Sequence, residues 1–250
     1  MYTLKKSLGQ HFLKDENICK KIVDSLPVIP NQQVLEVGPG AGAITKYLLE
    51  LPATSFKAVE LDTEKVGYLQ KTYPAIQGKL INESFLDVKP PFEGKFNVIG
   101  NFPYNISTQI MFRVLDWKDQ VPCVVGMFQK EVAQRIAAKH GNKDYGILSV
   151  LIQAFYKVEY LFEVSETCFN PPPKVKSAVI RLHRLEQAYD IPNERKFFNL
   201  VKTAFGQRRK QLRNPLKPLF DKEVLQDSFF TKRAEELTVA DFVALSHKMI

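Results

Sequence analysis

The sequence has few cysteines and no long apolar segment, and both absences narrow the class of protein. Its three cysteines, Cys19, Cys123 and Cys168, are widely spaced and form no Cys-x-x-Cys pair. They are typical of core thiols in a reducing compartment, and no structural zinc site is expected. No run approaches the roughly 20 apolar residues that a membrane helix needs, and the N-terminus lacks the apolar stretch of a signal peptide. We therefore expect a cytoplasmic protein.

Motifs of several common enzyme classes are missing as well. There is no Gly-Lys-Ser or Gly-Lys-Thr phosphate loop, which argues against a nucleoside triphosphatase. Neither a cluster of metal-ligating residues nor a paired nucleophile and base is apparent, so we expect no metal. At 250 residues the chain is long enough to bury a full core, in one large domain or in a large and a small one.

Positive charge is concentrated in one part of the chain. The net charge is +8, and the segment from Pro171 to Phe220 alone has twelve Lys and Arg against three acidic residues, a local excess of nine. Within it, Arg208, Arg209, Lys210 and Arg213 are interleaved with amides and an aromatic residue. A solvated helix face would explain a lone basic run. Because the excess is gathered here, we favour a surface that binds nucleic acid.

Short apolar runs alternate with helical patterns between about residues 33 and 182, which predicts an α/β domain with a mainly parallel sheet. Strands are expected at 34–37, 56–59, 96–99, 122–127 and 147–155, and helices at 44–51, 64–73, 108–117 and 130–139. Residues 175–182 form a later strand, expected to be antiparallel and near the sheet edge. Beyond about residue 186 only helical patterns follow, at 195–205, 222–229 and 240–249. We therefore expect two domains, 1–186 and a small all-helical domain at 187–250.

A glycine-rich turn follows the first of these strands. Gly38 and Gly40 lie between the strand and the next helix, and Glu60 ends the second strand. Backbone without side chains can approach a ligand closely, and a carboxylate at that position accepts hydrogen bonds from ribose hydroxyls. The arrangement predicts an adenosine-containing cofactor. It does not identify which one, because dinucleotide dehydrogenases share the glycine spacing. Glu83 and Ser84, where a third strand would end, are candidates to meet the adenine.

The tetrapeptide Asn101-Phe102-Pro103-Tyr104 follows another strand and suggests chemistry on a base that carries an amine. Pro103 pushes Phe102 into an extended conformation and holds its carbonyl outward as an acceptor. The Asn101 side-chain oxygen is a second acceptor, and Tyr104 offers a face for stacking. Two acceptors for the two amine hydrogens would direct the nitrogen lone pair toward attack. A Pro-containing turn with a core tyrosine explains the same four residues equally well.

Taken together, these motifs resemble the family of ribosomal RNA adenine dimethyltransferases over nearly the whole chain. The matching segments are Ser7 to Leu13, Glu36 to Gly42, Glu60 to Asp62, Asn101 to Ser107, Phe169 to Val175, and Phe205 to Lys210 followed by Leu212 to Asn214. The sequence departs from the commoner family pattern at three places. His11 stands where Asn is usual, Glu83 where Asp is usual, and Phe102 where Leu is usual.

The resemblance implies a Rossmann-like class I methyltransferase fold with an antiparallel edge strand, and S-adenosylmethionine as the cofactor. The implied reaction is dimethylation of the exocyclic amines of two adjacent adenosines near the 3′ end of small-subunit (16S) ribosomal RNA, within an immature 30S particle, by a monomer. The implied cofactor residues are Gln10, His11, Leu13, Gly38, Gly40, Glu60, Leu61, Glu83, Ser84 and Asn101. Those around the base are Asn101, Phe102, Pro103, Tyr104 and Phe169, and Arg208, Arg209, Lys210 and Arg213 would bind RNA.

Three alternatives stay open at this point. A methylase of the erythromycin-resistance type, which modifies the large-subunit RNA, shares the glycine turn and the Asn-x-Pro-Tyr motif. An NAD-type oxidoreductase would account for Gly38, Gly40 and Glu60 but leaves Asn101 to Tyr104 and the basic block unexplained. A non-catalytic assembly factor built on a methyltransferase scaffold is the third.

Overall fold

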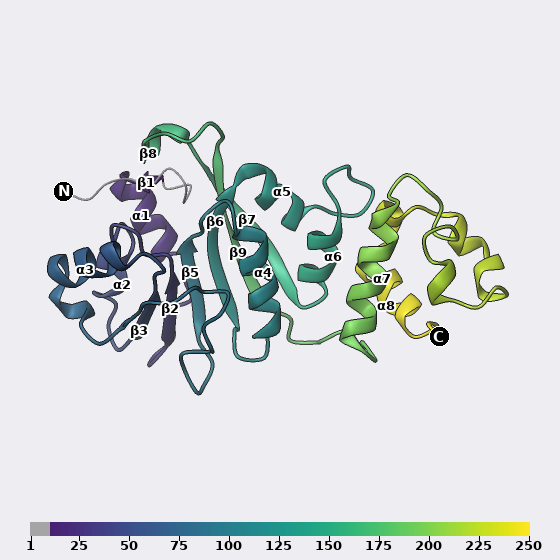
Figure 1. The fold of residues 1–250 in the computed structure, drawn as a ribbon, viewed down its shortest axis with the longest axis horizontal. Helices are drawn as coiled ribbons and strands as arrows, with labels where there is room; N and C mark the ends of the chain where they lie inside the picture. The colour runs from purple at the N-terminus through teal and green to yellow at the C-terminus, as the bar shows by residue number, and fades with distance from the viewer. Residues whose placement is uncertain (1–10) are drawn as a thin grey trace. The chain divides into compact units, whose positions relative to one another are not determined.

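A central seven-stranded sheet organises the chain in the computed structural model, which describes residues 11–250 (Figure 1). The strand order is β4-β3-β2-β5-β6-β9-β7. The strands are β2 (Gln33–Val37), β3 (Ser55–Val59), β4 (Leu80–Ile81), β5 (Asn97–Asn101), β6 (Cys123–Gln129), β7 (Tyr156–Val164) and β9 (Ser177–Arg184). β4, β3, β2, β5 and β6 run parallel, and β9 pairs antiparallel with β6. The strand expected to be antiparallel and near the sheet edge is β9, which lies one place in from the edge because β7 continues the sheet.

Eight α-helices connect the strands and follow the sheet within the described residues. They are α1 (Glu16–Val23), α2 (Thr45–Leu48), α3 (Thr63–Thr72), α4 (Ser107–Asp116), α5 (Lys130–Ala137), α6 (Ile147–Gln153), α7 (Glu194–Gly206) and α8 (Val239–Ser246). A separate antiparallel pair joins β1 (Phe12–Leu13) to β8 (Phe169–Asn170). None of the helices in the part of the chain that is described is long and apolar enough to cross a membrane.

Two elements differ from the sequence-based expectation in type. The apolar run at 147–155 was expected to be a strand, but Ile147–Gln153 is the helix α6. A short apolar run fits a buried helix as well as a strand, and periodicity cannot separate the two. The predicted helix at 222–229 is instead two 3₁₀ turns, Val224–Gln226 and Ser228–Thr231. The helix at 240–249 is confirmed as α8, with Thr238 and Asp241 forming a capping box at its start.

The chain divides into two compact units. One comprises the described residues up to Ala133 together with Glu159–Arg184, and the other comprises Gln134–Val158 together with Leu185–Ile250. The second unit thus contains α6 as well as α7 and α8. The boundary expected at residue 186 lies close to the second junction, whereas the inclusion of 134–158 was not foreseen.

The strand register places the chemically interesting residues at one edge of the sheet. Val37 of β2 pairs with Val59 of β3, and Glu36 pairs with Ile99 of β5. Because these strands are parallel, the residues that follow them emerge side by side at their carboxyl ends, where ligands of such sheets bind. The glycine turn, Glu60 and Asn101 are therefore neighbours.

Candidate active site

A cavity of about 190 Å³ lies at this edge of the sheet. It is lined by residues of the N-terminal strand β1, the glycine turn, the ends of β3 and β4, and the segment after β5. Of the residues singled out in the sequence, the cavity is lined by His11, Leu13, Gly38, Gly40, Glu60, Leu61, Glu83, Ser84, Asn101, Phe102, Pro103 and Tyr104. The structure thus brings both predicted groups, for a cofactor and for a base, into one space.

The glycine turn has a backbone conformation that disfavours other residues. Gly38, Gly40 and Gly42 have φ values of 68°, 61° and 84°. In this left-handed region a Cβ atom is strained, whereas glycine adopts it readily. At Gly42 a Cβ would in addition lie 2.4 Å from Cε2 of Tyr73. The turn therefore keeps its main chain close to the cavity without side chains in between.

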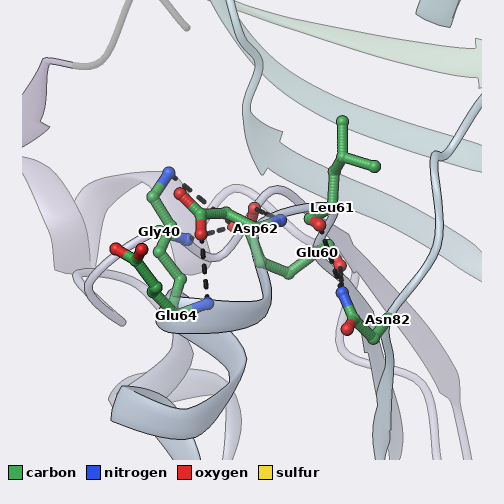
Figure 2. A network of polar contacts seen from close by, with 7 residues as sticks. Gly40, Glu60, Leu61, Asp62, Glu64 and Asn82 are labelled. Atoms are coloured by element: carbon green, nitrogen blue, oxygen red, sulfur yellow. Dashed lines mark hydrogen bonds and ion pairs between the residues drawn. The ribbon is translucent and has the colours of Figure 1, made fainter. Parts of the chain in front are cut away.

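Glu60 joins this turn to the start of α3 (Figure 2). Its Oε2 accepts a hydrogen bond from the Gly40 N–H at 3.1 Å, and its Oε1 accepts one from the Asp62 N–H at 3.0 Å. The residue is only 6% exposed. Two ionised oxygens offer about four acceptor sites, so each oxygen keeps one for a further donor. The carboxylate is held in place and can still accept ribose hydroxyls.

Asn82 holds the backbone beneath Glu60 from the neighbouring strand end. Its Nδ2 donates to the carbonyls of Glu60 at 2.9 Å and Leu61 at 3.2 Å (Figure 2). Its Oδ1 accepts from the hydroxyl of Thr63 at 2.9 Å. The segment Glu60 to Thr63 and the turn that begins at Asn82 are thus tied together. Glu83 directly follows Asn82, so this contact also places the predicted adenine-facing acid.

Two ionisable residues line the cavity without having been predicted to do so. Glu36 on β2 is 1% exposed, and burial raises its pKa to about 8, with the negative charge of Glu60 adding to the rise. Lys65 on α3 is 7% exposed, and its Nζ lies 4.0 Å from Oε2 of Glu60. Glu36 stands inside the strand before the glycine turn, and an acid in an otherwise apolar strand is a signal that the sequence contains. For Lys65 the sequence offers none, since a lysine on a helix is usually exposed.

The backbone of Phe102 is anchored by its buried side chain. Its N–H donates to the Met127 carbonyl at 3.2 Å, and its ring packs edge-on against Phe128 with the centroids 5.1 Å apart. A Cβ at Gly100 would lie 2.7 Å from the Phe102 ring, and one at Gly126 would lie 2.5 Å from it. Two glycines on adjacent strands therefore make room for the larger ring at this position.

Tyr104 is half-buried at the rim of the cavity. Its hydroxyl forms a hydrogen bond with the hydroxyl of Ser177, the first residue of β9. Burial raises the pKa of Tyr104, with the Ser177 bond opposing the rise, so the phenol stays neutral. Asn101, at the end of β5, and Pro103 complete this wall.

One residue predicted to border the base does not line the cavity, and one predicted cofactor residue lies outside the described part of the chain. Phe169 is 1% exposed and belongs to the apolar core, because in the short strand β8 its side chain faces inward while that of Asn170 is exposed. Leu13 is its partner across the β1–β8 pair. We therefore do not carry a stacking role for Phe169 forward. Gln10 lies outside the described residues.

The four predicted RNA-binding residues belong to the unit that contains α7 and α8, and their environments differ. Arg208 donates from Nε to Oε2 of Glu235 at 2.6 Å and from a terminal nitrogen to the Asn142 carbonyl at 3.2 Å. Arg213 is half-buried. Arg209 and Lys210 are exposed. Only the last two present their charges fully to solvent.

Comparisons with known proteins point to one group of enzymes. Residues 1–249 match the model of a family described as ribosomal RNA adenine dimethylase. The chain is 54% identical to ribosomal RNA small subunit methyltransferase A of Flavobacterium johnsoniae, over 98% of this chain and 95% of that protein. It is 51% identical to the protein of the same name from Cytophaga hutchinsonii, over 98% and 96%.

Solved structures with the same arrangement of elements include a dimethyladenosine transferase from Plasmodium falciparum. It has a TM-score of 0.79 and 26% identity, covering 94% of this chain and 96% of that one. The 23S rRNA methyltransferase ErmE has a TM-score of 0.73 at 21% identity, covering 95% and 99%. At that identity the second likeness speaks for the fold alone.

Proposed function

Because this chain belongs to the ribosomal RNA adenine dimethylase family, we propose that it dimethylates two adjacent adenosines near the 3′ end of small-subunit ribosomal RNA. As a family member with the class I methyltransferase fold, it is an rRNA adenine N6,N6-dimethyltransferase that depends on S-adenosylmethionine. One observation gives the main support for the proposed active site. The held carboxylate of Glu60 and the Asn101 to Tyr104 segment line the same cavity.

The residues around the glycine turn suit an adenosine-containing cofactor. Glu60 keeps acceptor sites for the ribose hydroxyls, and Gly38 and Gly40 let the main chain approach. Leu61 and the Glu83–Ser84 pair would border the adenine. When bound there, S-adenosylmethionine supplies a methyl group on a sulfonium, which is an excellent electrophile.

The neighbouring segment Asn101 to Tyr104 suits the amine of an adenine taken out of its stack. The Asn101 side-chain oxygen and the Phe102 carbonyl would accept the two amine hydrogens, and Tyr104 would stack on the base. The buried ring of Phe102 and its bond to Met127 keep that carbonyl in a fixed place. Asn101 carries no charge, so a monomethylated base can stay for a second transfer.

Catalysis in this site rests on positioning. Well-oriented reactants can gain about 7 to 11 kcal/mol over a bimolecular encounter. The amine becomes acidic once it is alkylated and can lose its proton to water, so the residues described need not include a strong base.

The partner is small-subunit ribosomal RNA. We propose that the enzyme is monomeric and cytoplasmic and that it binds this RNA within an immature 30S particle. The helical domain at 187–250, with its exposed Arg209 and Lys210, would face the RNA. Relatives about half identical over their full length are named as small-subunit enzymes, which favours this substrate over the large-subunit one.

The test is transfer of labelled methyl groups from S-adenosylmethionine to small subunits that lack the modification, followed by nucleoside analysis of the digested RNA. Dimethyladenosine near the 3′ end of the RNA is the expected product, with isolated large subunits as the control. Label in large subunits alone would favour the erythromycin-resistance type. Cofactor binding without transfer to either would favour a binding role.

A further inference from the structure

Ser177 contacts the base-facing tyrosine from a strand that runs against its neighbour. It is the first residue of β9, and it pairs antiparallel with Gln129, the last residue of β6. The start of β9 therefore lies at the edge of the sheet where the parallel strands have their carboxyl ends and where ligands of such sheets bind. From there the Ser177 hydroxyl reaches the hydroxyl of Tyr104, with the two oxygens 2.5 Å apart.

The serine end of this hydrogen bond is fixed by the sheet. Ser177 is fully buried, and the Lys176 carbonyl beside it accepts from the Lys130 N–H at 2.9 Å. A buried hydroxyl without a partner is unfavourable, which favours keeping the bond to Tyr104. Tyr104 lines the cavity, whereas Ser177 is not among the described residues that do. The serine can therefore influence a ligand only through the tyrosine.

A bond at the tip of the Tyr104 side chain restricts the whole ring. Two side-chain torsions set the position of a tyrosine ring, and a partner that holds the hydroxyl restricts both of them. Side chains that position a reacting group work best when such a second contact locks their conformation. The face that Tyr104 offers to a base is thus defined by a residue of β9.

We propose that Ser177 is a positioning residue for the target adenine, which holds the Tyr104 ring in the plane on which the base stacks. The proposal rests on the proposed function of the same site. A base stacked on a fixed ring keeps its amine in line with the methyl group in both transfers. The effect of Ser177 therefore falls on the transfer step and on the number of methyl groups added, and not on cofactor binding.

Substitutions at both ends of the bond separate this role from a merely structural one. Ser177→Ala and Tyr104→Phe each remove one of the two hydroxyls and keep the ring, and the double variant removes both. Ser149→Ala is the matched control, because Ser149 is also fully buried and its hydroxyl donates to the Arg135 carbonyl in the other unit.

For each protein we would measure the melting temperature and the Kd of S-adenosylmethionine by calorimetry. The single-turnover rate on small subunits that lack the modification follows, with the shares of monomethyladenosine and dimethyladenosine in the digested RNA. We expect Ser177→Ala and Tyr104→Phe to lower the rate by similar factors, about threefold to tenfold, the range for loss of one hydrogen bond. Both should raise the share of monomethyladenosine and leave the cofactor Kd unchanged.

The double variant should be little slower than either single variant, because both remove the same bond. Ser149→Ala should lower the melting temperature and leave the product shares unchanged. An unchanged rate for Ser177→Ala would overturn the proposal. So would losses that multiply in the double variant, or a share of monomethyladenosine that rises equally for Ser149→Ala. Wild-type protein inactive on small subunits would instead count against the proposed function.

Discussion

The N–H of Gly40 lies 3.1 Å from Oε2 of Glu60, twenty residues further along the chain. This bond ties the glycine turn to the end of the next strand, while the other carboxylate oxygen is held by Asp62. Both carboxylate oxygens of Glu60 thus accept from backbone N–H groups. Neither oxygen can be replaced by a donor group without loss of that hydrogen bond.

From this we expect Glu60→Gln to weaken cofactor binding although it is nearly isosteric. One oxygen becomes an NH₂ group, which faces a backbone N–H, and a buried donor loses its acceptor at a cost of about 1 to 3 kcal/mol. The Kd of S-adenosylmethionine should rise by about fivefold to a hundredfold, measured by calorimetry. Glu64→Gln, an exposed acid four residues further on, is the matched control. Equal Kd values for the two variants would contradict this account.

The ring of Phe102 and the glycines beside it form a second testable pair. Gly126→Ala would place a Cβ 2.5 Å from the Phe102 ring. We expect a loss of about 1 to 3 kcal/mol in the free energy of unfolding and a lower kcat, since the strained ring moves the backbone that carries the Phe102 carbonyl. Adding Phe102→Leu should restore part of both, because it removes the clash with residue 102 but leaves the Phe128 ring 2.6 Å from the same Cβ. Denaturant unfolding and single-turnover rates measure the two effects. Without such rescue, the lost activity has another cause.

The structure brings together in one cavity most of the residues that the sequence predicted around a cofactor, and the reason is physical. The order of strand, glycine turn, helix, strand and Glu60 is local in the chain, and parallel register then brings these parts together without further information. Whether Lys65 and Phe169 line the cavity depends on which way each side chain points, and the sequence does not give that direction. Phe169 precedes a Pro-rich turn and was expected at the pocket, but strand alternation in β8 turns it into the core.

The same limit explains why the segment at 147–155 was misassigned. The run at 147–155 is apolar throughout, so it fits a buried strand and a buried helix alike. Assigning it to a strand hid the alternating pattern of β7, at Tyr156–Val164, which follows directly. Register and burial, which the chain sets only once it is folded, decide between such alternatives.

Glu36 predicts an unusual dependence of stability on pH. Burial raises its pKa in the folded state to about 8, well above the usual value of 4.5 for an unfolded glutamate. Between these values the unfolded state releases the proton and the folded state keeps it. The free energy of unfolding should therefore fall as pH rises from about 4.5 to about 8, by on the order of 1.4 kcal/mol per pH unit from this group.

Glu36→Gln isolates that contribution because it keeps the shape and cannot ionise. Denaturant unfolding without added cofactor, at several pH values between 5 and 8, gives the difference in stability between variant and wild type. We expect this difference to grow steadily in favour of the variant as pH rises. Parallel curves for the two proteins would mean that Glu36 is ionised in the folded state.

The basic residues after α7 should separate into one that supports the fold and two that bind RNA. Arg208 is held by Glu235 and the Asn142 carbonyl, whereas Arg209 and Lys210 are exposed. We expect Arg208→Gln to lower the melting temperature, by an amount that corresponds to about 1 kcal/mol for a partly exposed ion pair. Replacing both Arg209 and Lys210 by Gln should leave the melting temperature unchanged.

Binding of ribosomal RNA should show the opposite pattern. Each lysine or arginine that neutralises a phosphate adds about one unit to the slope of log K against log salt. The double variant Arg209→Gln with Lys210→Gln should therefore bind small-subunit RNA more weakly at low salt, with a slope smaller by about two units, and keep its cofactor Kd. Lys71→Gln with Lys89→Gln removes the same charge from exposed positions in the other unit and is the matched control. If both double variants weaken RNA binding equally, net charge alone attracts the RNA and the surface after α7 makes no particular contact with it.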